Sequence, residues 1–112
     1  MKLLTQAQRK QLIANWEANA DGEDAIDFKP VVKILNPTGA GDWLFTEMKP
    51  DEDILFGLCC IHEPELGYAS LAEMEAYRGP WGIGLERDAH FKPDKTLSQY
   101  VELAREAGRI VT

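Results

Sequence analysis

The chain has 112 residues, of which 45% are hydrophobic, and its 19 acidic and 12 basic residues give a formal net charge of −7. This length and hydrophobic content predict a single domain, residues 1–112, with one modest core. The acidic balance excludes a surface built to bind phosphates, because such surfaces depend on clustered Lys and Arg, so we expect no direct binding to nucleic acid.

The first predicted element is a helix that begins after Thr5. A hydroxyl residue followed three positions later by Gln, here Gln8, is typical of a helix start, because the two side chains satisfy free backbone donors reciprocally. Four apolar side chains then fall on one helical face: Leu12, Ile13, Trp16 and Ala20. Asp21-Gly22 is expected to end the helix, and the acidic residues 21–24 are expected to form a solvated loop into a sheet.

A change to extended structure follows. Residues 31–35 are β-branched or apolar and lie between two prolines, which predicts a strand. Residues 36–42 are rich in turn formers and predict a hairpin loop, with a second strand over residues 43–48. Residues 54–61 are apolar on both faces, which predicts a central strand covered on both sides. Residues 66–69 and 82–86 predict two further short extended pieces.

Two more helices are predicted by the same start signal, at Ser70 with Glu73 and at Thr96 with Gln99. The inward residues expected of the first are Leu71, Met74 and Tyr77, and those of the second are Leu97, Tyr100, Val101 and Ala104. Because the strands come consecutively with short connections, we predict an α+β fold: a mostly antiparallel sheet of three to five strands packed by the N-terminal and C-terminal helices.

Negative charge is concentrated in the middle of the chain. Residues 42–75 contain one basic residue, Lys49, against nine acids, a net charge of −8. The nine are Asp42, Glu47, Asp51, Glu52, Asp53, Glu63, Glu65, Glu73 and Glu75. We expect these carboxylates to form a contiguous outward-facing surface that suits a protein partner with a basic surface.

The cysteines and histidines supply the donor types that zinc prefers, at Cys59, Cys60, His62 and His90. Successive side chains of a strand point to opposite faces, so Cys59 cannot join Cys60 and His62, and no paired C-x-x-C spacing is present. We therefore interpret both cysteines as buried thiols in a reducing compartment and expect no metal and no cofactor.

A polar cluster, residues 86–91, combines several chemical functions. Arg87 could clamp a carboxylate or phosphate, with Glu86 beside it and Asp88 orienting His90 through a ring nitrogen. The alternative, which we favour, is a loop pinned by an Arg–carboxylate pair with Phe91 in the core.

An acid/base site could also use His62, Glu63 and Glu65 together with Asp88 and His90. Because Glu63 and Glu65 flank Pro64 after the expected central strand, a solvated turn is the favoured interpretation, and no residue is assigned a catalytic role.

The segment 79–84 contains G-x-G but lacks the third glycine and the strand and helix of a nucleotide-binding loop. Its glycines instead predict a tight turn that presents Trp81 as an interface anchor.

Six segments together resemble one family. They are the opening residues 2–5, the strand 30–33, Trp43-Leu44-Phe45-Thr46-Glu47, Phe56-Gly57-Leu58-Cys59, the stretch 64–71, and Glu86-Arg87-Asp88 with His90-Phe91. The chain is similar over residues 2–104 to a small bacterial domain family of unknown function found largely on plasmids, phages and integrated conjugative elements. The resemblance implies a mobile-element accessory protein in the bacterial cytoplasm and carries over no catalytic residue.

The sequence thus favours a non-enzymatic, acidic protein-interaction module, anchored by an apolar residue such as Trp43 or Trp81, that could antagonise host nucleic-acid-handling or defence machinery. The alternative is a small enzyme or ligand-binding protein with its site at Tyr68 and residues 86–90. The residues expected to bind are Glu65, Tyr68, Trp81, Glu86, Arg87, Asp88 and His90. The N-terminus lacks the apolar stretch of a signal peptide and no run suggests a membrane span, so we expect a cytoplasmic protein, with its oligomeric state left open.

Overall fold

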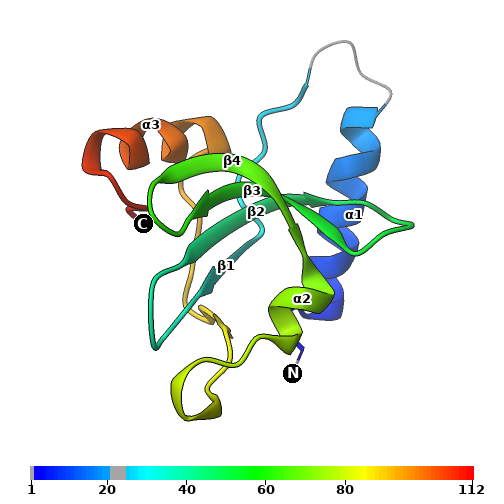
Figure 1. The fold of residues 1–112 in the computed structure, drawn as a ribbon. Helices are drawn as coiled ribbons and strands as arrows, with labels where there is room; N and C mark the ends of the chain where they lie inside the picture. The colour runs from blue at the N-terminus through cyan, green and yellow to red at the C-terminus, as the bar shows by residue number, and fades with distance from the viewer. Residues whose placement is uncertain (1, 21–24) are drawn as a thin grey trace.

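The computed structural model describes residues 2–20 and 25–112. Figure 1 shows helices at both ends of the chain and an antiparallel sheet between them, which confirms the predicted α+β class. In chain order the elements are α1 (Gln6–Ala20), β1 (Val32–Leu35), β2 (Asp42–Met48), β3 (Ile54–Cys60), β4 (Pro64–Ser70), α2 (Leu71–Ala76), the 3₁₀ turn η1 (Pro80–Gly82), β5 (Glu86–Arg87) and α3 (Leu97–Ala107). The expected helix end at Asp21-Gly22 and the acidic loop 21–24 lie outside the described residues.

The sheet has the order β4-β3-β2-β1-β5, with every pair antiparallel. The strand predicted to be central, β3, is covered on both faces as expected but lies one place from the middle, which β2 occupies. β3 is an interior strand, as predicted, with β4 and β2 on its two sides, and β5, a strand of only two residues, forms the far edge by pairing with β1. Of the extended piece expected at 82–86, only residue 86 lies in a strand, β5, and residue 82 belongs to the 3₁₀ turn of residues 80–82.

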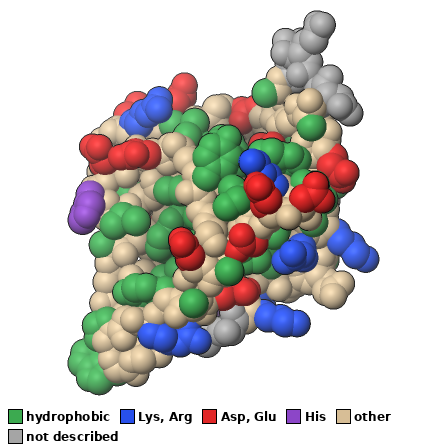
Figure 2. Space-filling view, turned by 45° about the vertical axis from the view of Figure 1, so that its right-hand side comes forward, with side chains coloured by type: hydrophobic (Ala, Val, Ile, Leu, Met, Phe, Trp, Pro, Cys, Tyr) green, Lys and Arg blue, Asp and Glu red, His purple; other side chains and the backbone are tan. Residues whose placement is uncertain are grey.

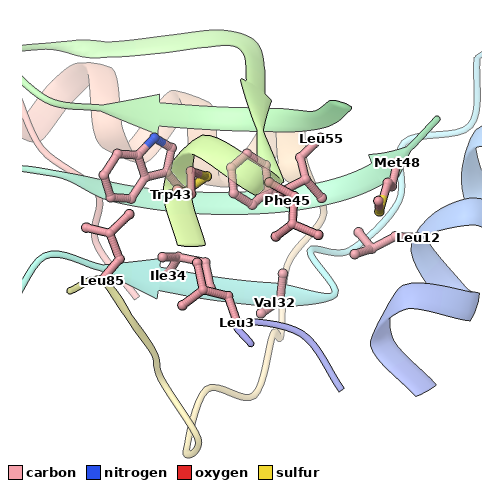
Figure 3. Close-up of a cluster of buried hydrophobic side chains, with 11 residues drawn as sticks. Leu3, Leu12, Val32, Ile34, Trp43, Phe45, Met48, Leu55 and Leu85 are labelled. Atoms are coloured by element: carbon pink, nitrogen blue, oxygen red, sulfur yellow. The ribbon is translucent and has the colours of Figure 1, made fainter. Parts of the chain in front are cut away.

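Two hydrophobic cores lie on opposite faces of the sheet because side chains alternate along each strand. Figure 3 shows the first, in which Val32, Ile34 and Phe45 meet Leu3, Leu12 and Leu85 from outside the sheet. Leu71 and Met74 of α2 belong to the same cluster. The second core joins Leu44 and Leu58 of the sheet to the inner face of α3, at Leu97, Tyr100, Val101 and Ala104, all of which are buried as predicted.

Helix α1 begins as predicted but packs differently. Thr5 N donates to Gln8 Oε1 at 3.0 Å and Gln8 N donates to Thr5 Oγ1 at 3.1 Å, so the capping pair is present. Leu12 is fully buried, whereas Ala20 is exposed, and the second buried residue of the helix is Asn15. Asn15 Nδ2 donates at 2.9 Å to the carbonyl oxygen of Thr46, where β2 has a bulge. The helix therefore meets the sheet partly through a hydrogen bond, which an apolar periodicity cannot reveal.

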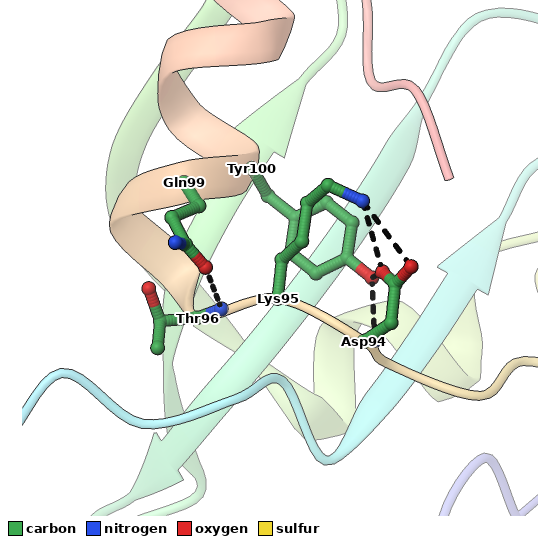
Figure 4. Close-up of polar contacts among 5 residues, drawn as sticks. All are labelled: Asp94, Lys95, Thr96, Gln99 and Tyr100. Atoms are coloured by element: carbon green, nitrogen blue, oxygen red, sulfur yellow. Dashed lines mark hydrogen bonds and ion pairs between the residues drawn. The ribbon is translucent and has the colours of Figure 1, made fainter.

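The other two helices also begin at the predicted caps. Ser70 Oγ accepts from Glu73 N at 3.2 Å, but Tyr77, expected to point inward, follows the end of α2 and is 40% exposed. At α3 both halves of the Thr96–Gln99 capping box are present, and the Tyr100 hydroxyl donates to Asp94 Oδ1 at 3.0 Å (Figure 4). In the described part of the chain, no helix combines the length and apolarity needed to span a bilayer.

Candidate functional site

The acidic residues of the middle segment do not form one surface. Asp53 caps α2, since its Oδ2 accepts from Ala72 N at 2.7 Å and from Ser70 Oγ at 2.9 Å. Glu75 Oε2 accepts from Leu3 N at 2.9 Å and so holds the N-terminal segment. Glu47 is 9% exposed, and Glu52 lies 3.3 Å from Lys49 Nζ. Four of the nine carboxylates thus have local structural roles or are buried.

The remaining five acids lie in three places. Asp51 lies in the β2–β3 turn, Glu73 belongs to α2, and Asp42, which pairs with Cys60, lies with Glu63 and Glu65 at the other end of β3, near the β3–β4 turn. A seven-residue strand separates these turns by about 20 Å. Figure 2 shows acidic side chains dispersed among hydrophobic and basic ones on the face in view. The prediction of one contiguous acidic surface was therefore wrong. Acids that are close in sequence are separated in space because the two turns that flank a strand lie at its opposite ends.

The capping role of Asp53 leads to a prediction about acid stability. The hydrogen bonds from Ala72 N and the Ser70 hydroxyl hold the pKa of Asp53 below its ordinary value. Because the folded pKa is depressed, the stabilisation is fully present above the unfolded value, about 4, and is lost as the pH falls through the folded pKa. We expect Asp53→Asn to lower the thermal midpoint at neutral pH, with the gap to the wild type closing below about pH 4. Thermal melts across the acid range measure that gap, and Asp51→Asn, an exposed acid of the neighbouring turn, should show no such convergence.

The two parts of the alternative site lie on opposite edges of the sheet. Tyr68 belongs to β4 and Glu86 and Arg87 form β5, so three strands separate them, about 19 Å from edge to edge. The structure therefore does not bring Tyr68 together with residues 86–90. Their expected convergence near the glycine-rich turn is wrong, since strand order was not readable from the sequence.

Residues 86–91 form a locally hydrogen-bonded segment. Arg87 Nη1 donates to the carbonyl oxygen of Leu3 at 2.9 Å, so the arginine pins the N-terminal segment through a backbone group instead of a carboxylate. Asp88 Oδ1 accepts from the backbone N of His90 at 2.9 Å, and Phe91 packs against the α3 core. Asp88 and His90 line a polar hollow of about 320 Å³, which Glu86 and Arg87 do not line.

The two cysteines point to opposite faces, as the strand alternation predicts: Cys59 packs against the first core and Cys60 against the second. Both are partly exposed, not fully buried as expected. Burial, with a smaller contribution from the nearby Glu65 carboxylate, raises the pKa of the Cys59 thiol to about 11, which makes it a poor nucleophile at neutral pH. Within residues 2–20 and 25–112, no group of three or more His, Cys, Asp or Glu side chains is arranged to hold a metal ion.

The two tryptophans considered as interface anchors differ in their surroundings. Trp43 is 8% exposed and belongs to the first core, so it is not available to a partner. Trp81 is 89% exposed and has a positive φ of 58°, a conformation that is uncommon for a residue with a side chain. The glycine-rich turn therefore exposes the Trp81 side chain, as predicted.

The outer strand β4 is a site that the sequence identified only in part. It was expected as a four-residue piece, and Pro64 and Glu65 were expected in a turn, but β4 is seven residues long and includes both. Leu66 is 47% exposed and Tyr68 is 63% exposed. The signal that could have identified them is their spacing of two, which puts both on one face of a strand.

A hollow lies beside β4 on the face that carries α2. It has a volume of about 550 Å³ and is lined mainly by apolar side chains, among them Trp43, Cys59, Ile61, Met74, Tyr77 and Leu85. Glu73 also lines it, and Glu65 is exposed on the same face of β4 because it pairs with Cys59. Tyr68 also lines this hollow, but its ring lies beside Phe56 on the α3 face, with ring centroids 5.2 Å apart. The two sides of β4 thus differ chemically: acidic groups beside an apolar hollow on one, and exposed apolar side chains on the other.

Neither a curated protein nor a solved structure matches the chain significantly. A family match does cover nearly the whole of it, over residues 3–111, and includes β4, the hollow beside it and the segment 86–91. The chain therefore belongs to the DUF2958 family, which is described as a protein of unknown function.

Proposed function

We propose that this domain is a protein-binding module that accepts an extended segment of a partner as an additional strand on β4. The observation that carries the proposal is the outer position of β4 in the sheet, where, among the described residues, no strand pairs with its other side. An edge strand presents a row of unpaired backbone N–H and C=O groups, which a peptide can satisfy with main-chain hydrogen bonds.

The composition of β4 supports this role. Natural edge strands are commonly protected by proline, by charged side chains, by bulges or by being very short. In β4 such protection is confined to its first two residues, Pro64 and Glu65. Residues 66–70 contain no charge and no proline and pair in unbroken register with β3. β4 is thus protected at residues 64–65 and unprotected over residues 66–70. A strand that receives a partner strand requires such an unprotected stretch.

The two faces of β4 define the chemistry of the partner. On the α2 face an added strand would pass the carboxylates of Glu65 and Glu73, and on the α3 face it would pass Leu66 and Tyr68. Since side chains of a strand alternate, the complementary segment alternates Lys or Arg with apolar residues. The overall charge of −7 favours approach of such a segment at long range.

The mobile-element setting implied by the family resemblance suggests where such a partner occurs. Proteins that handle nucleic acid, including those of host defence, carry basic extended segments, and an acidic domain that binds one would obstruct its contact with phosphates. Because a net charge of −7 is modest and its carboxylates are dispersed, we propose recognition of a segment, not imitation of the DNA backbone.

A synthetic peptide tests the proposal directly. We expect an eight-residue peptide that alternates Lys and Val to bind, to perturb the NMR signals of residues 66–70 and to protect outward β4 amides from hydrogen exchange. Glu65→Lys should weaken this binding by about fivefold or more, because it turns a favourable charge pair into a repulsive one. Tyr68→Ala should also weaken it, by removing exposed apolar contact area.

The matched control is Glu106→Lys, which makes the same charge change at an exposed position of α3 and should leave peptide binding nearly unchanged. Affinity capture from a bacterial lysate with wild-type and Glu65→Lys baits then identifies natural partners. Equal binding of a peptide that alternates Glu and Val, or signal changes centred on Trp81 instead of β4, would contradict the proposal.

A further inference from the structure

Two adjoining hollows lie on the α3 face of the sheet, where the end of α1 approaches it. Their volumes are about 380 Å³ and 250 Å³. Four residues line both: Asn19, Ala25, Glu47 and Phe56. The hollows therefore adjoin along a shared wall, and together we call them the Glu47 hollow after the charged residue of that wall. The larger volume alone falls within the range of small-molecule sites.

The burial of Glu47 is the first observation that points to a ligand in this hollow. The residue is 9% exposed, although an ionised carboxylate loses much hydration when it is buried. Among the described residues its side chain makes only one hydrogen bond, a long one of 3.4 Å from the Thr46 hydroxyl to Oε2. None of the ion pairs of the described residues involves it.

The second oxygen of this carboxylate faces the hollow. Oε1 takes part in none of the hydrogen bonds of the described residues. Every fully buried side-chain nitrogen or oxygen of the described residues does have a partner, so Oε1 is not fully buried. Since the rest of Glu47 is enclosed and the residue lines both hollows, the open side of Oε1 is the hollow itself.

The surrounding side chains suit a cation with an apolar stem. Trp16, Phe56 and Tyr68 line the smaller hollow, and aromatic faces attract cations: Lys49 Nζ already lies 5.4 Å from the centroid of the Trp16 ring, which leaves Phe56 and Tyr68 for a ligand. The other carboxylate near the base of α3, Asp27, is occupied: it accepts from Ser98 N at 3.1 Å and from the Ser98 hydroxyl. Burial raises the pKa of Asp27, but the hydrogen bonds from Ser98 and Thr96 outweigh this effect and lower it. Glu102 and Arg105 also line the larger hollow but are exposed, so Glu47 is the buried carboxylate that lacks a close partner among the described residues.

We propose that the Glu47 hollow binds an organic cation, an ammonium group on an apolar stem. The ammonium donates to Glu47 Oε1 and the stem lies against Phe56. This inference goes beyond strand pairing on β4. The two sites share Leu66 and Tyr68, but Glu47 belongs to β2, two strands in from that edge, so substitution of Glu47 separates them.

Two probes carry an ammonium group: phenethylamine, a small amine, and N-acetyl-lysine methylamide, which represents a lysine side chain. The third probe, 2-phenylethanol, is phenethylamine with a hydroxyl in place of the ammonium. We expect NMR titration to show at least one cation binding with shifts at Asn19, Phe56 and Val101, about tenfold more tightly than 2-phenylethanol. The cation that binds more tightly identifies the source, a small amine or a lysine of a partner protein.

Glu47→Gln keeps the size of the side chain and should weaken cation binding about tenfold or more. The thermal midpoint of this variant should not fall, because the substitution removes a buried charge. Glu102→Gln, on the exposed rim of the same hollow, is the matched control and should change affinity by less than about twofold. Ala25→Phe fills the hollow with Glu47 intact and should also abolish binding, which keeps the test valid if the glutamine variant folds poorly.

Three results would overturn the proposal: no shift with either cation, equal affinity for 2-phenylethanol, or unchanged cation affinity in Glu47→Gln. The Lys–Val peptide is titrated into the same variants. Its binding to β4 should persist in Glu47→Gln, so failure of the cation site and failure of strand pairing are distinguished.

Discussion

Gly57→Ala is expected to cost the domain most or all of its folding stability. A Cβ at this position would lie 2.0 Å from the carbonyl oxygen of Leu44 and 2.8 Å from the Cα of Phe45, both in the neighbouring strand β2. Because these contacts are with backbone at the centre of the sheet, β2 and β3 would have to separate or shift. Overpacking ordinarily costs 1 to 3 kcal/mol, and we expect roughly 3 kcal/mol or more here because no flexible side chain can yield.

Gly67→Ala is the matched control for that substitution. Gly67 pairs directly with Gly57 across β3 and β4, yet a Cβ there would meet nothing within 4 Å. It should fold with nearly wild-type stability, measured by chemical denaturation of both variants. If both variants lost similar stability, the cause at Gly57 would be the conformational preference of glycine and not the close approach of the β2 backbone.

Phe45→Ala is expected to remove about 3 to 5 kcal/mol from the free energy of unfolding. The side chain is fully buried and is the largest of those with less than 2% exposure. It lies in the middle strand and belongs to the first core, with Val32, Leu12 and Leu55 in the same cluster (Figure 3). Because the residues of this cluster are themselves buried, they can close a cavity there only partly, so the loss should be near the upper end of that range.

Phe45→Leu serves as the graded comparison, since it leaves a smaller cavity. Urea denaturation should show the alanine variant losing at least twice as much stability as the leucine variant, with similar denaturant dependence. A loss of less than about 1 kcal/mol in Phe45→Ala would contradict the packing seen around this residue, because it would require the cluster to collapse without strain.

Local signals of the sequence predicted most of the elements. The helix starts predicted at Thr5, Ser70 and Thr96 are all present, because a cap depends on residues three positions apart; the bonds are reciprocal at Thr5 and Thr96, whereas at Ser70 the hydroxyl alone caps the helix. The strong periodicity of α3 predicted its buried face correctly. The weaker pattern of α1 did not, since that helix contributes Asn15 to the interior and contacts the bulge at Thr46 by a hydrogen bond.

The candidate site was less accessible to sequence reasoning. Tyr68 and Arg87 were placed in one hypothetical site, but strand order puts them at opposite edges. Glu47 was counted only as one acid of a charged surface, although its neighbours in space, Asn19 and Val101, come from helices far away in the chain. Neither fact has a local signature, because both depend on which distant segments meet.

The amino-acid sequence by itself determined the α+β class, the helix starts, the alternation that puts Cys59 and Cys60 on opposite faces, and the net negative charge. Each of these follows from interactions within a few residues or from composition alone. The tertiary structure decided that the carboxylates are dispersed, that β4 is an outer strand of the sheet and that Glu47 is enclosed beside a hollow. The physical reason is that pairing order and burial arise from contacts between residues distant in the chain, whose free energies a local pattern does not contain.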